Sequence, residues 1–216
     1  MTSTKVEASQ SVPVLVVFLT ITIERQPNMG APLTIPRRLL TLDEYHTIGA
    51  AGVLKEDDRI ELIEGEMIEM APIGSRHVAK VNWLARLLSQ CVGDQAIISV
   101  QNPIALPPHN EPQPDIALQK PRADYYEGKL AGAEDILLVI EVSDTTLTYD
   151  RDAKMPIYAH HGIVEAWLVD IQGQMVSIYQ EPGKNGYRRL LTPARNESIT
   201  PSQLPNVMIR LVDLWK

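Results

Sequence analysis

Apolar and polar residues repeat with different periods along the chain, and each period predicts one kind of element. Residues 76–92 repeat apolar side chains at helical spacing, which predicts an amphipathic helix capped by Ser75. Residues 59–70 alternate acidic and apolar side chains around Glu64-Gly65, the pattern of a two-stranded hairpin. Residues 136–143 are almost continuously apolar, so we expect a strand that is buried on both faces.

The remaining segments mix further helices with strands. Thr41 and Glu44 have the spacing of a capping box, so a short first helix should run to about Gly49 or Gly52. The other expected elements are strands over 96–106, 113–118, 164–171 and 175–179, and a helix over 149–161 with a kink at Pro156. The pattern predicts an α/β fold with a central mixed sheet flanked by helices and preceded by a helix and a hairpin.

The length of 216 residues suits a single domain with its own core. We expect this domain over residues 35–216, preceded by an N-terminal extension over 1–34. The apolar run from Val12 to Ile23 is shorter than the roughly 20 residues that span a bilayer, so no transmembrane segment is expected. A single cysteine, Cys91, excludes an intrachain disulfide and fits a reducing, cytoplasmic location.

Charge and motifs narrow the function classes further. The net charge of −7 argues against tight non-specific binding of polyanions, although a local basic groove could still bind phosphate. The sequence has no Gly-rich phosphate loop, no Gly-x-Ser-x-Gly turn and no Cys-x-x-Cys pair. These absences argue against enzymes with an organic nucleotide cofactor, serine hydrolases and zinc ribbons.

Two acidic residues stand in otherwise apolar strands. Asp115 lies in Gln113-Pro114-Asp115-Ile116-Ala117, and Glu141 lies in Leu138-Val139-Ile140-Glu141-Val142-Ser143. A carboxylate in such a strand is costly to desolvate unless it is paired, hydrogen-bonded or bound to a metal ion.

If the two strands are antiparallel neighbours, Asp115 lies beside Glu141 at one edge of the sheet. Carboxylates with carbonyl and water oxygens are the ligands that Mg²⁺ prefers, so the pair is a candidate magnesium site. Lys154, early in the following helix, could stabilise charge on a phosphate or orient the attacking water.

These motifs carry a family resemblance. The Pro114-Asp115 pair, followed by Glu141-Val142-Ser143, resembles the signature of the PD-(D/E)XK nuclease superfamily. The resemblance becomes more specific, to the Uma-two family of restriction endonuclease-like proteins, over five ordered blocks between about Leu40 and Tyr187. These blocks are 61–66, 111–115, 139–143, 150–159 and 162–170.

The resemblance implies a restriction endonuclease-like fold and Mg²⁺-dependent hydrolysis of phosphodiester bonds in DNA, with Mn²⁺ as a possible substitute. It implies Asp115 and Glu141 as metal ligands, Glu61 of the hairpin as a supporting acid and metal ligand, and Lys154 as the catalytic lysine. The departure from the superfamily signature is at Ser143, where a lysine would stand; within the family that lysine comes from the following helix, and Lys154 matches its position. The resemblance also suggests a homodimer, because two sites would address two strands.

Each candidate residue also has an ordinary structural explanation. Glu61, with Glu64, Glu66 and Glu69, could form the solvated face of the hairpin. Asp115 could be a strand-start residue bonded to nearby backbone. Glu141 could form a buried ion pair with Arg151 or Lys154, and Lys154 could pair on the surface with Asp150.

Two neighbours of these residues have simpler expectations. His77 should make a local hydrogen bond at the start of its helix, although it could approach the acidic hairpin. Tyr158, one helical turn after Lys154, could line the same cleft, but the simpler expectation is a packed ring with its hydroxyl in water.

Two other functions compete with the nuclease. One is a non-catalytic protein that binds nucleic acid or another partner and keeps the nuclease fold with a decayed site. The other is a metal-independent hydrolase in which Asp115 and Glu141 form an acid and base pair, which predicts no effect of a chelator and gives Lys154 no role.

Overall fold

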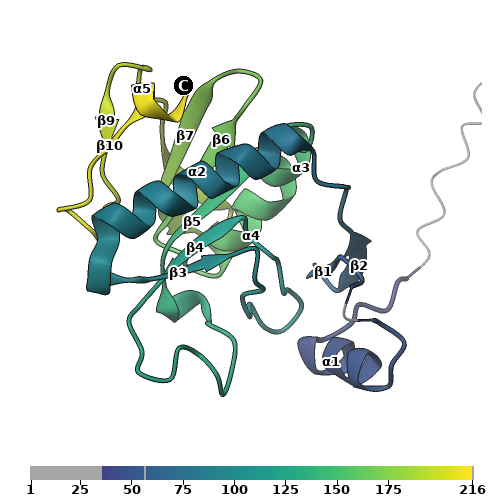
Figure 1. The fold of residues 1–216 in the computed structure, drawn as a ribbon. Helices are drawn as coiled ribbons and strands as arrows, with labels where there is room; N and C mark the ends of the chain where they lie inside the picture. The colour runs from purple at the N-terminus through teal and green to yellow at the C-terminus, as the bar shows by residue number, and fades with distance from the viewer. Residues whose placement is uncertain (1–35, 56, 216) are drawn as a thin grey trace, which may run out of the picture. The chain divides into compact units, whose positions relative to one another are not determined.

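Six strands form one mixed sheet at the centre of the fold (Figure 1). The computed structural model describes residues 36–55 and 57–215, so the predicted extension over 1–34 lies outside the described residues. The strands follow the order β3 (Ile97–Val100), β4 (Ile116–Gln119), β5 (Ile136–Ser143), β6 (Glu165–Asp170), β7 (Met175–Gly183) and β8 (Gly186–Leu191). Only the β5–β6 pair is parallel. The predicted α/β class with a central mixed sheet is confirmed.

Strand β5 lies inside the sheet, and its position sets the geometry of the candidate acids. All eight of its residues are buried, as the apolar run predicts. The neighbouring β4 runs antiparallel to it with Ile116 opposite Ile140. Asp115 therefore stands just outside β4 at the end where Glu141 lies, and the predicted pairing of these two segments is confirmed.

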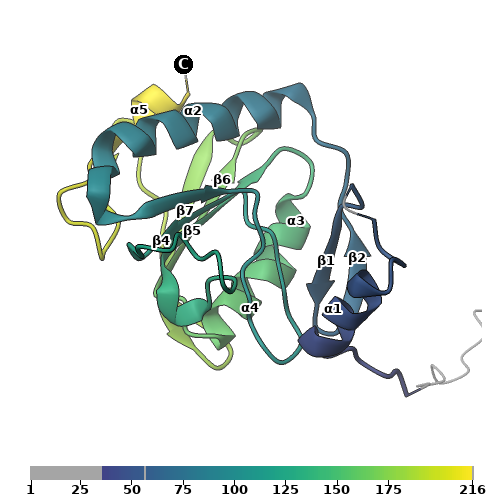
Figure 2. The ribbon, with the colours of Figure 1, turned by 60° about the horizontal axis from the view of Figure 1, so that its bottom comes forward.

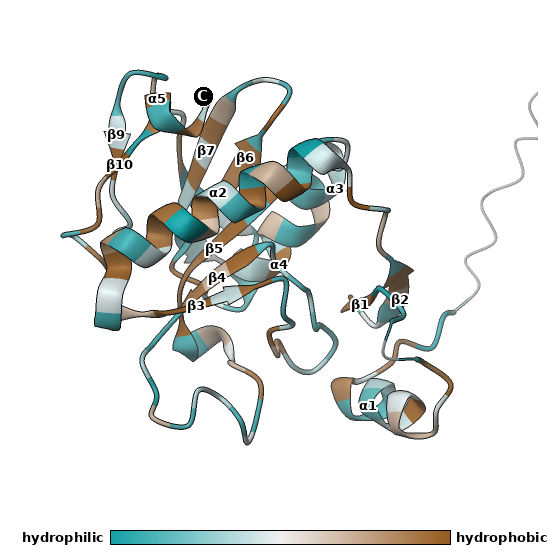
Figure 3. Cartoon of the chain, in the orientation of Figure 1, coloured by the Kyte–Doolittle hydropathy of each residue, from teal (hydrophilic) through white to brown (hydrophobic). Residues whose placement is uncertain are grey.

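The sheet is covered on both faces. Helix α2 (Ser75–Val92) contributes Val81, Leu84, Leu88 and Val92 to the core on one face. The C-terminal elements β9 (Ser198–Ile199), β10 (Ile209–Arg210) and α5 (Leu211–Leu214) add to the same core. Figure 3 shows the apolar colour concentrated on the central strands and interrupted by hydrophilic positions along α2. This distribution is expected of an amphipathic helix that covers a buried sheet.

The second face is covered by the crossover that joins the parallel strands β5 and β6 (Figure 2). It consists of α3 (Leu147–Tyr149), a π-helical segment η3 (Asp150–Lys154) and α4 (Met155–His160). The predicted kink at Pro156 takes the form of the π-helical segment just before it, where the Met155 amide donates to the Asp150 carbonyl. Pro156 has no amide hydrogen to continue an ordinary helical ladder, which favours the irregular turn at this place.

The hairpin is a separate two-stranded sheet of β1 (Ile60–Ile63) and β2 (Glu66–Glu69). Its turn has positive φ angles at both central residues, +50° at Glu64 and +78° at Gly65, as the sequence pattern predicts for a tight hairpin. Helix α1 (Leu42–Ala50) precedes it, and Thr41 with Glu44 makes the predicted capping box.

The predicted boundaries were wrong at several places. Ser75 is the first residue of α2 rather than its cap, because Gly74 takes the cap position without a side-chain bond. The strand expected over 96–106 ends at Val100, since Gln101 has a φ of +52° and leaves the extended conformation. The strand expected from 113 begins at Ile116, after two prolines that cannot donate to a ladder.

Several elements were not predicted at all. They are β8 and the C-terminal β9, β10 and α5, together with the short 3-10 helices η1 (Gly93–Gln95) and η2 (Ala133–Asp135). Strand β8 has no buried residue, so it lacks the apolar alternation by which a strand is found. None of the helices that the structure describes is long and apolar enough to cross a membrane.

Candidate active site

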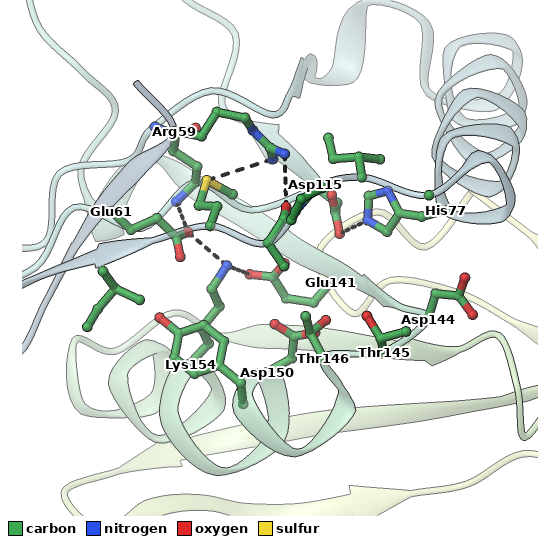
Figure 4. Close-up of a pocket in the computed structure, with 18 of the residues that line it drawn as sticks. Arg59, Glu61, His77, Asp115, Glu141, Asp144, Thr145, Thr146, Asp150 and Lys154 are labelled. Atoms are coloured by element: carbon green, nitrogen blue, oxygen red, sulfur yellow. Dashed lines mark hydrogen bonds and ion pairs between the residues drawn. The ribbon is translucent and has the colours of Figure 1, made fainter. Parts of the chain in front are cut away.

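A cavity of about 400 Å³ lies among the hairpin, the start of α2, the ends of β4 and β5, and the helical crossover (Figure 4). Charged side chains from all of these elements line it. They are Arg59, Glu61, Glu69, His77, Asp115, Glu141, Asp144, Asp150 and Lys154. The structure thus brings the four residues singled out from the sequence, Glu61, Asp115, Glu141 and Lys154, to one cavity.

Asp115 is fixed by contacts to both of its carboxylate oxygens. Oδ2 accepts the Val142 amide at 2.9 Å, and the Gln101 side-chain amide donates to Oδ1 at 3.1 Å. The His77 Nε2 atom lies 3.0 Å from Oδ2. The prolines at 112 and 114 keep this segment out of the ladder, so the carboxylate can bond across to the neighbouring strand instead of pairing regularly.

Glu141 is deeply buried, with a side chain only 2% exposed. The Tyr158 hydroxyl donates to its Oε1, and Lys154 Nζ lies 3.3 Å from the same oxygen. Burial raises the pKa of Glu141 well above its usual range, and the nearby negative charges raise it further, while Lys154 acts in the opposite sense. The ionised form of Glu141 therefore depends on positive charge beside it.

Lys154 comes from the π-helical segment, and its side chain is 5% exposed. Its Nζ lies 2.8 Å from Glu61 Oε1, which joins the crossover to the hairpin. Burial would lower the pKa of Lys154, but the carboxylates of Glu141 and Glu61 hold it above its ordinary value. Lys154 therefore carries a positive charge between two acids.

Glu61 is buried in β1, whereas Glu64 and Glu69 of the same hairpin are exposed and Glu66 is half-buried. Besides Lys154, its Oε1 accepts the Gln113 amide at 2.7 Å. The alternative in which Glu61 belongs to a solvated face is wrong, because its relative exposure is 1%.

The alternative ion pairs have mixed outcomes. The expected buried ion pair of Glu141 is present with Lys154, within a network that includes Glu61. The alternative of a surface pair between Lys154 and Asp150 is wrong, because Lys154 is buried and pairs with Glu61 and Glu141. Asp150 accepts the Ser143 hydroxyl at 2.6 Å and the Thr146 hydroxyl at 2.7 Å.

Comparison with known proteins identifies the family. The Uma2 family, described as "putative restriction endonuclease", matches residues 42–211. The chain belongs to the Uma2 family. The match spans the hairpin, the sheet and the crossover, so every element that lines the cavity lies within it.

A solved structure shares the fold of this Uma2-family chain. It is the crystal structure of "a putative nuclease belonging to DUF820" from Anabaena variabilis, with a TM-score of 0.65 and 19% sequence identity. The alignment covers 82% of this chain and 97% of that chain. A search of curated proteins gave no significant match. Family and fold are therefore those of a restriction endonuclease-like nuclease.

The acids of this Uma2-family site fit a hard cation through their oxygens and their excess negative charge. Six carboxylates line the cavity with only two cationic side chains, Arg59 and Lys154. Three of these carboxylates, those of Glu141, Glu61 and Asp150, lie close enough to Lys154 to raise its pKa. Within the described residues no three His, Cys, Asp or Glu side chains form a ready-made metal cage. Mg²⁺ does not need such a cage, since it is usually bound through one or two carboxylates plus waters and substrate phosphates.

Two contacts of the site were not predicted. His77 reaches Asp115, 38 positions away, rather than making a local bond, and nothing in the sequence near His77 points to that partner. Tyr158 is fully buried and bonds to Glu141 instead of keeping a wet hydroxyl. Its spacing of one helical turn from Lys154 was a usable signal, because such residues share a helix face.

Proposed function

We propose that this protein is a Mg²⁺-dependent endonuclease that hydrolyses phosphodiester bonds in DNA. The observation that carries the proposal is the meeting of Asp115, Glu141 and Lys154 in one cavity, since they come from separate elements of the chain. Family membership supports a nuclease and the excess of carboxylates supports a cation. The choice of DNA rests on the family.

Asp115 and Glu141 are the proposed metal ligands, with Mn²⁺ as a substitute for Mg²⁺. When bound, the ion would supply a Lewis acid for a phosphoryl oxygen and a bound water of lowered pKa. Asp115 is suited to ligation because the Val142 amide and the Gln101 side chain already hold its orientation. Glu61 is proposed as the supporting acid that holds Lys154 and as a third ligand if the ion displaces that contact.

Lys154 is proposed to stabilise the negative charge that develops on the phosphate. Its ammonium is held between Glu61 and Glu141, so it is positioned before the substrate arrives. In the reaction a water oxygen bonds to phosphorus, the P–O bond to one sugar breaks, and the departing oxygen takes a proton that balances the one lost by the water.

The buried network also supports a second candidate function. Lys154 with Glu61 and Glu141 has the contacts of a structural ion-pair cluster, and such clusters occur without catalysis. A non-catalytic protein that binds nucleic acid or another partner would keep this cluster and the nuclease fold. It would bind DNA without cutting it.

The test combines metal binding with cleavage on the same samples. We expect wild-type protein to bind Mg²⁺ in calorimetry and to nick supercoiled plasmid, and we expect Asp115→Asn to lose the binding heat and at least about a hundredfold of the rate. Asp94→Asn, at an exposed position in η1, is the matched control and should change neither.

Three outcomes would redirect the proposal. DNA binding without cleavage by either Mg²⁺ or Mn²⁺ would support the binding protein. Cleavage that survives a chelator would support metal-independent acid and base catalysis by Asp115 and Glu141. Metal binding that persists in Asp115→Asn would place the ion elsewhere.

The site of action and the assembly are also proposals. The single Cys91 fits a reducing cytoplasm, where we propose that the protein acts. A homodimer, which would bring two sites to a substrate, stays a prediction from the family. Light scattering at working concentration checks it, and a monodisperse monomer with and without DNA would contradict it.

A further inference from the structure

Unpaired polar atoms gather around the candidate active site. Among the described residues, three buried side-chain atoms have no hydrogen-bond partner, and all three residues line this cavity: His77 Nδ1, Asp144 Oδ1 and the Tyr149 hydroxyl. Arg76 compensates the charge of Asp144, with an ion-pair distance of 2.8 Å. Folded proteins pair nearly all buried polar atoms, so these two remaining groups have a contact to make with water or with a bound molecule.

The wall beside these polar groups is largely apolar. Ile68 and Met70 contribute to it from the hairpin and its exit, and Pro72 and Ile73 from the segment that leads into α2. Ile73 is also 36% exposed, so its side chain is accessible from the cavity side of this segment. The cavity volume of about 400 Å³ lies in the range of pockets for small organic groups. An apolar wall has no use in binding phosphate or metal, but it suits the face of a base.

The depth of the acids restricts how a nucleic acid can reach them. The side chains of Glu61 and Glu141 are each 2% exposed and that of Lys154 is 5% exposed, so a reacting phosphate must enter the cavity. A duplex is stiff and holds its bases in a stack, whereas an unpaired strand can turn single nucleotides into a pocket. Entry from a duplex would cost a few kcal/mol of unstacking.

The few positive charges near the cavity suit contact with a short stretch of one strand rather than with an extended duplex. Arg59 and Lys154 are the Lys and Arg residues of the lining, and both already have partners within the protein. Binding that neutralises many phosphates requires an extended row of cations, and the chain carries a net charge of −7.

We propose that the cavity takes one unpaired nucleotide of a DNA strand, with its base against the apolar wall of Ile68, Met70 and Ile73 and with the Tyr149 hydroxyl bonded to it. This inference rests on the proposed function, and it makes single-stranded or locally unpaired DNA the substrate class. Tyr149 is then a residue that touches the substrate. Its ring lies 5.8 Å from Lys154 Nζ, beside the group that faces the phosphate.

The first test compares substrates of one sequence: a single strand, a perfect duplex and a duplex with an internal unpaired bubble. With Mg²⁺ or Mn²⁺ we expect the strand and the bubble to be cut about tenfold faster than the duplex, because the duplex must first be unstacked. Equal cutting of all three would overturn the inference and leave the nuclease function standing. Faster cutting of a single-stranded RNA of the same sequence would overturn the choice of DNA.

The second test measures binding without divalent ions, so that it does not depend on catalysis. A strand with 2-aminopurine should gain fluorescence on binding as the base leaves its neighbours. The affinity of the protein for this strand should decrease only weakly with salt, with a slope of about −1 to −2 in a plot of the logarithm of the binding constant against the logarithm of the salt concentration. Strand binding of this kind without cleavage of any substrate would overturn the nuclease function and keep the pocket assignment. If the protein neither bound the strand nor cut any substrate, the pocket assignment and the nuclease function would both be overturned.

Matched variants locate the contact. We expect Tyr149→Phe and Ile73→Ser each to weaken strand binding about fivefold, while duplex binding changes little. The controls are Tyr125→Phe and Met208→Ser, whose side chains are 75% and 64% exposed and lie outside the cavity lining. Equal effects of the variants and their controls would overturn the assignment of the wall.

Discussion

At the scale of single residues, the site is a buried charge network in which each member depends on another. Lys154 stands between Glu61 and Glu141, and Tyr158 donates to Glu141. A buried charge that loses its partner is strongly destabilising, whereas the intact pair contributes little net stability. Substitutions in this network should therefore affect stability as well as activity, and the two effects must be measured separately.

Glu61→Gln should cost about 2 to 4 kcal/mol in the free energy of unfolding, because it leaves Lys154 with one charged partner while the glutamine can still accept the Gln113 amide. Urea unfolding measures this loss. The matched control is Glu64→Gln at the exposed hairpin turn, which should change stability by less than about 0.5 kcal/mol. A Glu61→Gln variant as stable as wild type would contradict the network.

Tyr158→Phe should cost about 1 to 3 kcal/mol, since the buried Glu141 carboxyl loses a hydrogen-bond donor at nearly constant side-chain volume. Tyr126→Phe is the matched control, because its hydroxyl bonds to the Lys120 carbonyl at the surface. Thermal unfolding of both variants gives the comparison. Equal changes in Tm would show that the Tyr158 hydroxyl contributes nothing specific.

At the scale of elements, the hairpin and the π-helical segment supply the two partners of one ion pair, Glu61 and Lys154. The hairpin is not part of the central sheet, so its position depends on its turn and on contacts such as the Glu111 amide to the Leu62 carbonyl at 2.7 Å. Gly65 sits in that turn, where an added Cβ would lie 2.6 Å from the Cβ of Leu39. The turn is thus a structural requirement of the site even though none of its atoms enters the cavity lining.

Gly65→Ala should displace the hairpin, because it combines a φ of +78° with that clash. We expect a loss of about 1 to 3 kcal/mol in unfolding free energy and a larger relative loss of cleavage, since Glu61 moves away from Lys154. Gly49→Ala in α1 is the control, because its added Cβ meets nothing within 4 Å, and it should be neutral or stabilising. Equal activity of the two variants would disprove the dependence on the hairpin.

At the scale of the whole molecule, stability at acid pH depends on groups buried by the packing of distant segments. His161 follows α4 and lies near Asn110, whose side-chain nitrogen is 3.4 Å from Nε2. Burial lowers the pKa of His161 below its ordinary value of 6.5, and the nearby His160 lowers it further. The folded state therefore binds its proton less readily than the unfolded chain does.

This shift has a definite sign. The contribution of His161 to stability is fully present above about pH 6.5, and it is lost as the pH falls through the lower folded pKa. Between about pH 8 and pH 5 we expect the Tm of His161→Asn to rise relative to that of wild type, because the variant lacks the group that destabilises the folded state on protonation. His160→Asn, at an exposed position, should retain most of the wild-type dependence. Identical pH profiles for wild type and His161→Asn would contradict the assignment.

The sequence by itself determined the features that depend on neighbouring residues. The hairpin, α2, the buried strand β5 and the capping box of α1 follow from periods and turn residues that lie within each segment, so they could be predicted without knowing the rest of the chain. The same holds for the choice of Asp115 and Glu141 as unusual acids, because their apolar surroundings are visible in the sequence.

The strand pattern already placed Asp115 beside Glu141, but only the tertiary structure decided the hydrogen bonds and ion pairs that hold the site together. The bonds of His77 to Asp115 and of Lys154 to Glu61 join segments that are far apart in the chain, so no local pattern encodes them. The same reason explains why β8 and the C-terminal elements were missed, since partners in the sheet and in the core stabilise them more than their own sequence does. The apolar wall and the unpaired Tyr149 hydroxyl of the cavity likewise exist only after the hairpin, α2 and the crossover have packed together.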